Sequence, residues 1–139
     1  DRSIFKIVDL DEAWAFLNVA QGETLSNKLV RAGRAMNAGV YFVTQSSGDV
    51  SKESLKNNIG LKFSFRSTDT NEIKQTLEFF GLDSEDENNQ KRLRDLENGQ
   101  CLMQDLYGRV GVVQIHPVFV ELLHAFDTRP PIKSEVDLE

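Results

Sequence analysis

The sequence of 139 residues has only one cysteine, Cys101, and three prolines. One cysteine excludes an internal disulfide framework and a zinc site built from several cysteines. No hydrophobic run approaches the roughly 20 apolar residues that a membrane-spanning helix needs. Basic residues are also in the minority, with 16 Lys and Arg against 22 Asp and Glu, for a formal net charge of −6. This balance argues against broad nucleic-acid binding, although not against a local basic patch.

What is present is typical of a globular domain from a reducing compartment, with 40% hydrophobic and 27% charged residues. The sequence begins at Asp1 rather than at a methionine and ends in Leu138-Glu139, a pair that cloning often leaves behind. We expect a fragment of a longer protein. Residues 1–127 should form the folded part, and residues 128–139, which contain Pro130-Pro131, should form a disordered tail.

Strand patterns alternate with helical patterns along the chain. Strands are predicted at 4–10, 40–44 and 61–66, and a hairpin at 100–104 and 109–116 joined by residues 105–108. Helices are predicted at 12–20, 24–37, 51–58, from a cap at Asp69 or Thr70 to 80, through Leu93 and Leu96 to 98, and at 118–126. This order predicts an α/β domain with a mainly parallel sheet, flanking helices and a C-terminal antiparallel hairpin.

The helix over 24–37 carries an apolar stripe and a basic side. The stripe that should face the core consists of Leu25, Leu29, Ala32 and Met36. Lys28, Arg31 and Arg34 fall away from it, and residues 24–48 contain no Asp or Glu. Two arginines one turn apart suit phosphate oxygens, although a charged run is often an ordinary solvated face.

Three acidic residues, Asp9, Asp11 and Glu12, follow or end the first strand. Ligands of open α/β sheets bind at the carboxyl ends of strands, where one carboxylate can hold Mg²⁺ and another can activate water. We assign Asp11 to the metal and Glu12 to the water, and expect Asp9 to pack or cap a helix and Trp14 to pack under the first helix. The alternative is a set of acidic residues that only complements a helix dipole.

The second strand ends in Thr44-Gln45, at the same edge of the sheet. A glutamine there can sense a phosphate or orient water, as in other phosphoryl-transfer sites. The alternative is an amide that caps the following loop. Cys101 is expected to be a small apolar residue within a strand.

Several motifs in order resemble one family. Residues 6–14, Lys-Ile-Val-Asp-Leu-Asp-Glu-Ala-Trp, resemble the Walker B segment of conjugative-transfer (type IV secretion) ATPases of the HerA–FtsK superfamily, similar to TraC and TraE. Residues 29–39 and 40–45 resemble the next helix and the strand that ends in glutamine. Residues 99–102 and 108–111 resemble the C-terminal hairpin, so the match spans roughly residues 4–116.

The resemblance implies part of a RecA-like P-loop ATPase that uses ATP and Mg²⁺. Asp11 would match the Mg²⁺-site acid, Glu12 the catalytic glutamate and Gln45 the polar sensor. Arg34 or Arg31, then Arg109, and last Arg66 would match an arginine that reaches the γ-phosphate of a neighbouring subunit. Such motors form homo-oligomers such as hexamers, work with other secretion-machine subunits and DNA, and lie at the cytoplasmic face of the bacterial membrane.

One family element is missing, because no Gly-x-x-x-x-Gly-Lys-Ser/Thr occurs in the sequence. In the family this phosphate loop lies upstream, so we expect the chain alone neither to bind ATP tightly nor to hydrolyse it. Its strand would lie between 40–44 and 61–66, so 40–44 should keep a free edge or pair with 61–66. Two other functions stay open: a metal-dependent nuclease or phosphatase using Asp9, Asp11 and Glu12, and a non-catalytic interaction domain.

Overall fold

The fold was analysed in a computed structural model, which describes residues 3–50, 53–125 and 127. The side chains of Arg34, Glu53 and Ser54 lie outside this description. The expected tail at 128–139 also lies outside the described residues.

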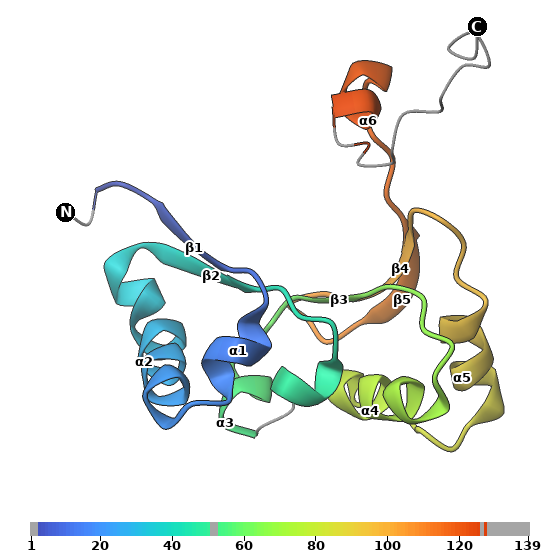
Figure 1. The fold of residues 1–139 in the computed structure, drawn as a ribbon, viewed down its shortest axis with the longest axis horizontal. Coiled ribbons are helices and arrows are strands. Elements are labelled where there is room, and N and C mark those ends of the chain that lie inside the picture. The colour runs from blue at the N-terminus through green and yellow to red at the C-terminus, as the bar shows by residue number, and fades with distance from the viewer. Residues whose placement is uncertain (1–2, 51–52, 126, 128–139) are drawn as a thin grey trace, which may run out of the picture.

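Five strands and seven helical segments follow one another along the described chain (Figure 1). The strands are β1 (Lys6–Leu10), β2 (Ala38–Phe42), β3 (Lys62–Ser64), β4 (Gln100–Gln104) and β5 (Val110–Gln114). The helices are α1 (Ala13–Leu17), α2 (Ala20–Met36), α3 (Glu53–Lys56), α4 (Thr70–Phe80), α5 (Glu87–Arg94) and α6 (Val120–Ala125), with a 3₁₀ turn, η1, at Ser47–Val50. Every predicted element is present; β4 has the predicted bounds, and most of the others have shifted ends.

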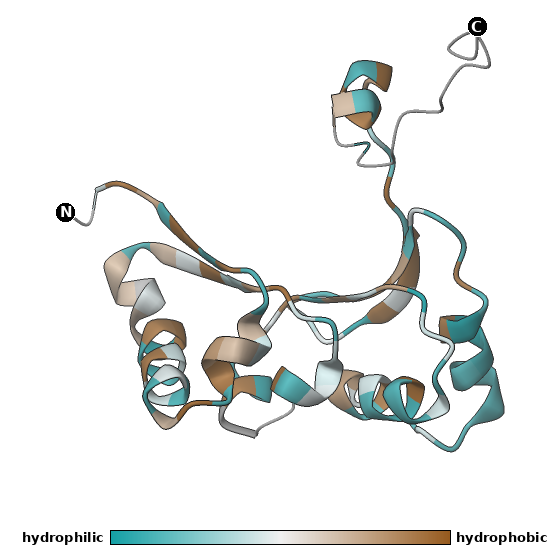
Figure 2. Cartoon of the chain, in the orientation of Figure 1, coloured by the Kyte–Doolittle hydropathy of each residue, from teal (hydrophilic) through white to brown (hydrophobic). Residues whose placement is uncertain are grey.

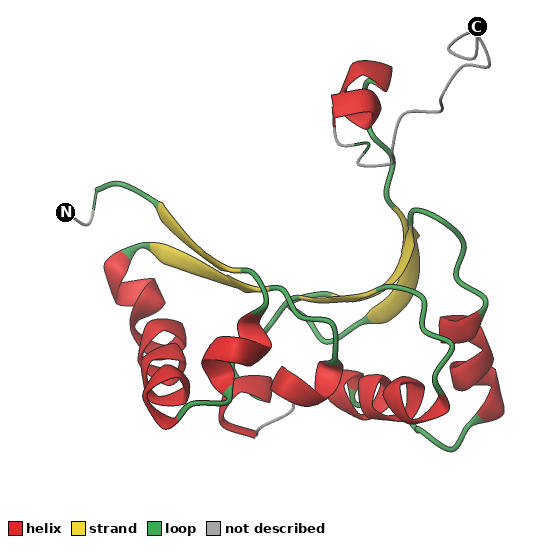
Figure 3. Ribbon diagram, in the orientation of Figure 1, coloured by secondary structure: helices red, strands yellow, loops and turns green. Residues whose placement is uncertain are grey.

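The strands form two sheets rather than one (Figure 3). β1 and β2 pair in parallel, with Asp9 opposite Tyr41 and Leu10 opposite Phe42. β3, β4 and β5 form an antiparallel sheet, with Leu102 of β4 between Ser64 and Val112. Within the described residues β2 therefore has one free edge, and β3 pairs with β4 instead of moving beside β2.

Helices α1 to α5 cover one side of the strands, and α6 stands apart beyond β5 (Figure 1). The core lies between these helices and the strands. Its buried side chains are Ala13, Leu17, Val50, Leu55, Ile73, Leu77, Phe79, Phe80, Leu93, Leu96 and Leu102, with Leu10 and Phe42 packed against them. Helix α5 is mostly hydrophilic (Figure 2) and contributes Leu93 alone to this buried set. Cys101 is buried within β4, as predicted.

On the opposite side of β1 and β2 no helix of the described residues lies over the strands, and several apolar side chains are exposed there (Figure 1). Leu10 and Phe42 pack into the core. Because side chains alternate along a strand, Ile7, three positions before Leu10, and Tyr41 and Val43, on either side of Phe42, point to the other face. These three side chains are 59%, 53% and 50% exposed, and Phe63 of β3 and Phe65, directly after β3, are exposed as well. Parallel sheets usually have both faces covered.

Helix α2 packs through small residues, and only the middle of the predicted stripe, Leu29 and Ala32, is partly buried. Leu25 and Met36 are about half exposed, whereas Ser26 and Gly33 are buried. A Cβ on Gly33 would lie 2.8 Å from the carbonyl oxygen of Ala38, so α2 reaches β2 through the glycine. Close backbone approach, rather than large apolar side chains, decides which side of this helix faces inward.

Helix α4 is held at both ends. At its start the Asp69 carboxylate accepts a hydrogen bond from the Glu72 N–H at 2.8 Å, and at its end Gly81 adopts a left-handed conformation. Lys62 Nζ donates to the carbonyl of Phe79 at 2.8 Å, and Gln104 Nε2 donates to that of Phe80 at 3.1 Å. Burial, with Lys56 nearby, lowers the pKa of Lys62 below its usual value.

Candidate active site

The ends of β1 and β2 are joined by two backbone hydrogen bonds beyond the paired residues. Val43 N–H donates to the carbonyl of Leu10 at 3.0 Å, and Ala13 N–H donates to the carbonyl of Val43 at 2.9 Å. The chain thus turns from β1 into α1 directly beside the segment that leaves β2. This places Glu12 next to Gln45 at the carboxyl edge of the parallel pair.

Glu12 has an unusual backbone conformation at this turn. Its φ of 53° and ψ of 45° lie in the left-handed region, which few residues other than glycine occupy. Its N–H donates to Asp11 Oδ1 at 3.0 Å, which stabilises the turn. Strained residues of this kind cluster at active sites because the surrounding structure must hold them in place.

Both oxygens of the Glu12 carboxylate accept a hydrogen bond. Gln45 Nε2 donates to Oε1 at 2.9 Å, and Trp14 Nε1 donates to Oε2 at 2.6 Å. A carboxylate offers about four acceptor positions, so one donor on each oxygen still leaves room for a water molecule. The carboxylate is exposed and oriented, as a group that accepts a proton from water needs to be.

The loop that follows Gln45 is fixed to α4 by Glu72. The Glu72 carboxylate accepts hydrogen bonds from the Ser46 hydroxyl at 2.8 Å, the Ser47 N–H at 2.8 Å and the Ser47 hydroxyl at 2.9 Å. Thr44, on the other side of Gln45, donates its hydroxyl to Asp49 at 2.7 Å. Gln45 therefore lies between two residues, Thr44 and Ser46, that are each hydrogen-bonded to another part of the fold.

The other two acidic residues lie in different surroundings. Asp11 is exposed in the turn after β1, where its Oδ1 accepts the hydrogen bond from the Glu12 N–H. Asp9 is exposed on the open face opposite Tyr41, so the prediction that it packs or caps a helix is wrong. The N-cap of α1 is Glu12 itself, without a side-chain cap. Asp9 lies within β1 and follows its alternation to the open face, whereas Asp11 lies in the turn after β1, where the alternation has ended.

The candidate arginines are not brought to Glu12 within the described residues. Arg31 is exposed on α2, Arg66 is exposed after β3, and the side chain of Arg34 lies outside the description. Arg109 lies in the turn of the β4–β5 hairpin, directly before β5, where its Nη2 and Nε each lie 2.6 Å from Asp105 Oδ2. This pair lowers the pKa of the Asp105 carboxyl, mainly through the side-chain hydrogen bond from Arg109.

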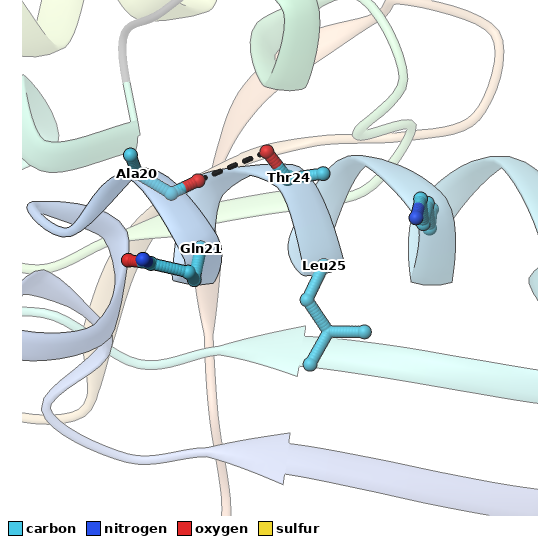
Figure 4. A pocket seen from close by; sticks show the side chains of 5 residues that line it. Ala20, Gln21, Thr24 and Leu25 are labelled. Carbon is cyan, nitrogen blue, oxygen red and sulfur yellow. Dashed lines mark hydrogen bonds between the residues drawn. The ribbon is translucent and has the colours of Figure 1, made fainter.

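A shallow hollow on the outer side of α2 does not belong to this site (Figure 4). It is lined by Ala20, Gln21, Thr24, Leu25 and Lys28. The Thr24 hydroxyl donates to the carbonyl of Ala20 at 2.9 Å, so its polar group is satisfied within the helix. Lys28 is one of the basic residues noted on this helix, and it borders the hollow.

Two residues of the site were not recognised from the sequence. Trp14 was expected to pack under α1, but its side chain is 46% exposed and bound to Glu12. The position of Trp14, two residues after the glutamate and in the first turn of a helix, could have indicated this contact. Nothing in the sequence indicated the role of Glu72, because it lies 25 residues after Ser47 and on another element.

Across residues 3–50, 53–125 and 127, no group of three or more His, Cys, Asp or Glu side chains could hold a metal ion. In the same part of the chain, no helix has the length and apolar character needed to cross a membrane.

Comparison with known proteins identifies the class. The fold is that of a P-loop NTPase: it matches the genome-packaging NTPase B204 of Sulfolobus turreted icosahedral virus 2, solved with ATP-γS, at a TM-score of 0.60 and 15% identity, over 80% of this chain and 52% of that one. The expected fold class is thereby confirmed.

Residues 1–126 match the family model described as an AAA-like domain, and the chain belongs to that family. It is also 34% identical over 119 residues to the uncharacterized protein YddE of Bacillus subtilis (strain 168). That match covers 86% of this chain but 14% of the relative, so the chain spans about a seventh of the length of that protein.

Proposed function

We propose that this chain is the part of an ATP-hydrolysing motor that follows the phosphate loop, and that it supplies the residue that activates water. The observation that supports this most directly is the Glu12 carboxylate, which is exposed, held by a strained turn and hydrogen-bonded to Gln45 at 2.9 Å. Membership of the AAA-like domain family and the P-loop NTPase fold support the same class of reaction.

In this proposal the residues divide the work of phosphoryl transfer. Glu12 accepts a proton from the attacking water, Asp11 holds the Mg²⁺ that accompanies ATP, and Gln45 contacts the attacking water or the γ-phosphate. The donor set fits Mg²⁺, because Asp11 is an exposed carboxylate and phosphate oxygens normally complete its coordination. The triphosphate itself is bound by the backbone N–H groups and the lysine of a phosphate loop. This sequence contains no phosphate-loop motif.

We further propose that the motor serves conjugative DNA transfer or type IV secretion. The support is the resemblance of residues 6–14, 29–45 and 99–111 to the motifs of that family of ATPases. The motor would then be a homo-oligomer such as a hexamer, at the cytoplasmic face of the bacterial membrane, working with other machine subunits and with DNA. An arginine of one subunit, Arg31, Arg34 or Arg109, would complete the site of the next.

The test compares Mg²⁺-ATP turnover by the full-length protein with turnover by its Glu12→Gln variant. Loss of the proton acceptor should lower kcat by about 100-fold or more, while binding of a fluorescent ATP analogue persists. Glu121→Gln on α6, an exposed glutamate outside the site, is the matched control and should keep wild-type turnover. Equal turnover in wild type and Glu12→Gln would remove Glu12 from the chemistry.

The transfer role has its own experiment. A host that carries the protein within its conjugative element should lose transfer of that element when Glu12→Gln replaces the wild type, with the protein level unchanged. Normal transfer by a variant shown to lack ATPase activity would contradict this role and leave the ATPase proposal standing.

A further inference from the structure

Trp14 is the only tryptophan of the chain, and its indole N–H is committed to the candidate site. Nε1 lies 2.6 Å from Glu12 Oε2, while the ring remains 46% exposed. A tryptophan that served only the core would bury its ring, as large aromatic side chains usually do. Here the polar end of the side chain has a defined partner and the apolar body is half in solvent.

The two donors on Glu12 are arranged differently. Gln45 belongs to a loop 33 residues away and approaches Oε1, whereas Trp14 lies two residues further along the same segment and approaches Oε2. A rigid ring with a donor and no acceptor, Trp14 can only donate to this carboxylate. Hydrogen bonds to an ionised carboxylate are about twice as strong as neutral ones, so the indole fixes the carboxylate rotation.

We propose that Trp14 is a positioning residue for hydrolysis: its indole N–H holds Oε2 of Glu12 so that Oε1 faces Gln45 and the attacking water. This inference rests on the proposed function, since it needs Glu12 to be the proton acceptor. In this role Trp14 contacts neither the attacking water nor the nucleotide. A misplaced carboxylate costs turnover rather than substrate binding, because the geometry of proton transfer is what changes.

The first experiment tests the contact in the chain itself, without nucleotide. The single tryptophan gives one indole signal in a ¹H–¹⁵N spectrum, and the bond to Glu12 should move it downfield and slow its exchange with solvent. Glu12→Gly removes the carboxylate and suits the backbone, because φ at this position is 53°. The signal should shift upfield in this variant. An unchanged signal would overturn the proposal.

The second experiment tests the consequence in the full-length protein. Trp14→Phe keeps an aromatic ring without the donor, and Trp14→Gln keeps a donor without the ring. The proposal expects kcat to fall about tenfold in Trp14→Phe, with KM for Mg²⁺-ATP within twofold of wild type, and to recover partly in Trp14→Gln. Tyr41→Phe, an exposed aromatic on β2, is the control and should leave both constants unchanged.

The outcomes separate this inference from the proposed function. Wild-type kcat in Trp14→Phe would overturn the inference and leave Glu12 as the base. Equal losses in Trp14→Phe and Trp14→Gln would assign Trp14 to packing and also overturn it. Absence of turnover in the wild-type protein, with the indole signal still dependent on Glu12, would reject the function and with it the positioning role, while the contact itself stands.

Discussion

Gln45 donates its side-chain amide to Glu12 across 2.9 Å, although 33 residues separate the two in the sequence. The bond joins the ends of two parallel strands, and it is the contact through which a group near Gln45 can act on Glu12. If Glu12 activates water, as proposed, this hydrogen bond couples it to whatever group Gln45 contacts.

Replacing Gln45 should therefore reduce turnover through Glu12. We expect Gln45→Ala to lower kcat of the full-length protein by about tenfold, since one charge-assisted hydrogen bond is lost. Combined with Glu12→Gln, it should add little further loss, because both changes act on the same step. Steady-state kinetics of the two single variants and the double variant measure this coupling, and additive losses would show that Gln45 acts independently.

Glu72 should stabilise the loop that carries Gln45. Glu72→Ala removes the acceptor of three hydrogen bonds from Ser46 and Ser47 and should lower the free energy of unfolding by about 1–3 kcal/mol. Asp69→Ala at the start of the same helix is the control: it should cost about 1 kcal/mol as a lost cap but leave the loop in place. Urea unfolding measures stability, and amide exchange of residues 45–48 should rise in Glu72→Ala alone.

Gly33 should resist substitution even though alanine favours helices. In Gly33→Ala the new Cβ would lie 2.8 Å from the Ala38 carbonyl oxygen, so α2 must move away from β2. The strain should outweigh the helix-propensity gain of about 1 kcal/mol and lower the melting temperature. Gly111→Ala on β5, where nothing lies within 4 Å of the added atom, should change it little. Equal melting temperatures for both variants would contradict the packing described for α2.

Lys62 predicts a pH dependence of stability. Burial lowers its pKa in the folded protein, so the unfolded chain binds the proton more tightly. The contribution of Lys62 to the free energy of unfolding should therefore rise as the pH increases from the lowered pKa towards 10.5. Urea unfolding from pH 7 upward should show the wild type gaining stability relative to Lys62→Met, and a constant difference would contradict the prediction.

Local signals in the sequence were sufficient for most of the fold. Asp69 and Gly81 marked both ends of α4, and the hairpin residues 105–108 marked the turn between β4 and β5, because caps and turns depend on a few neighbouring residues. The first strand begins at Lys6 rather than Ile4, since its first backbone bond, Lys6 N–H to the Asn37 carbonyl, requires β2. Strand ends depend on partners that a linear pattern does not contain.

The candidate site was predictable only where it follows from strand topology. The carboxyl ends of neighbouring parallel strands lie at the same edge of a sheet. Glu12 and Gln45 follow two such ends and are in contact, as expected. The indole bond of Trp14 depends on a side-chain rotamer, and the anchoring by Glu72 depends on how α4 packs, so neither follows from spacing. The inward side of α2 was mispredicted because hydrophobic periodicity gives no weight to Gly33.

The contacts of helix α4 should make the two sheets unfold together. Its first turn binds the loop after β2 through Glu72, and its last carbonyls bind β3 and β4 through Lys62 and Gln104. The two sheets share no strand pairing within the described residues, so α4 ties one to the other. Its inner amides should consequently exchange with deuterium only when the whole domain unfolds, and both sheets should lose protection in the same cooperative event.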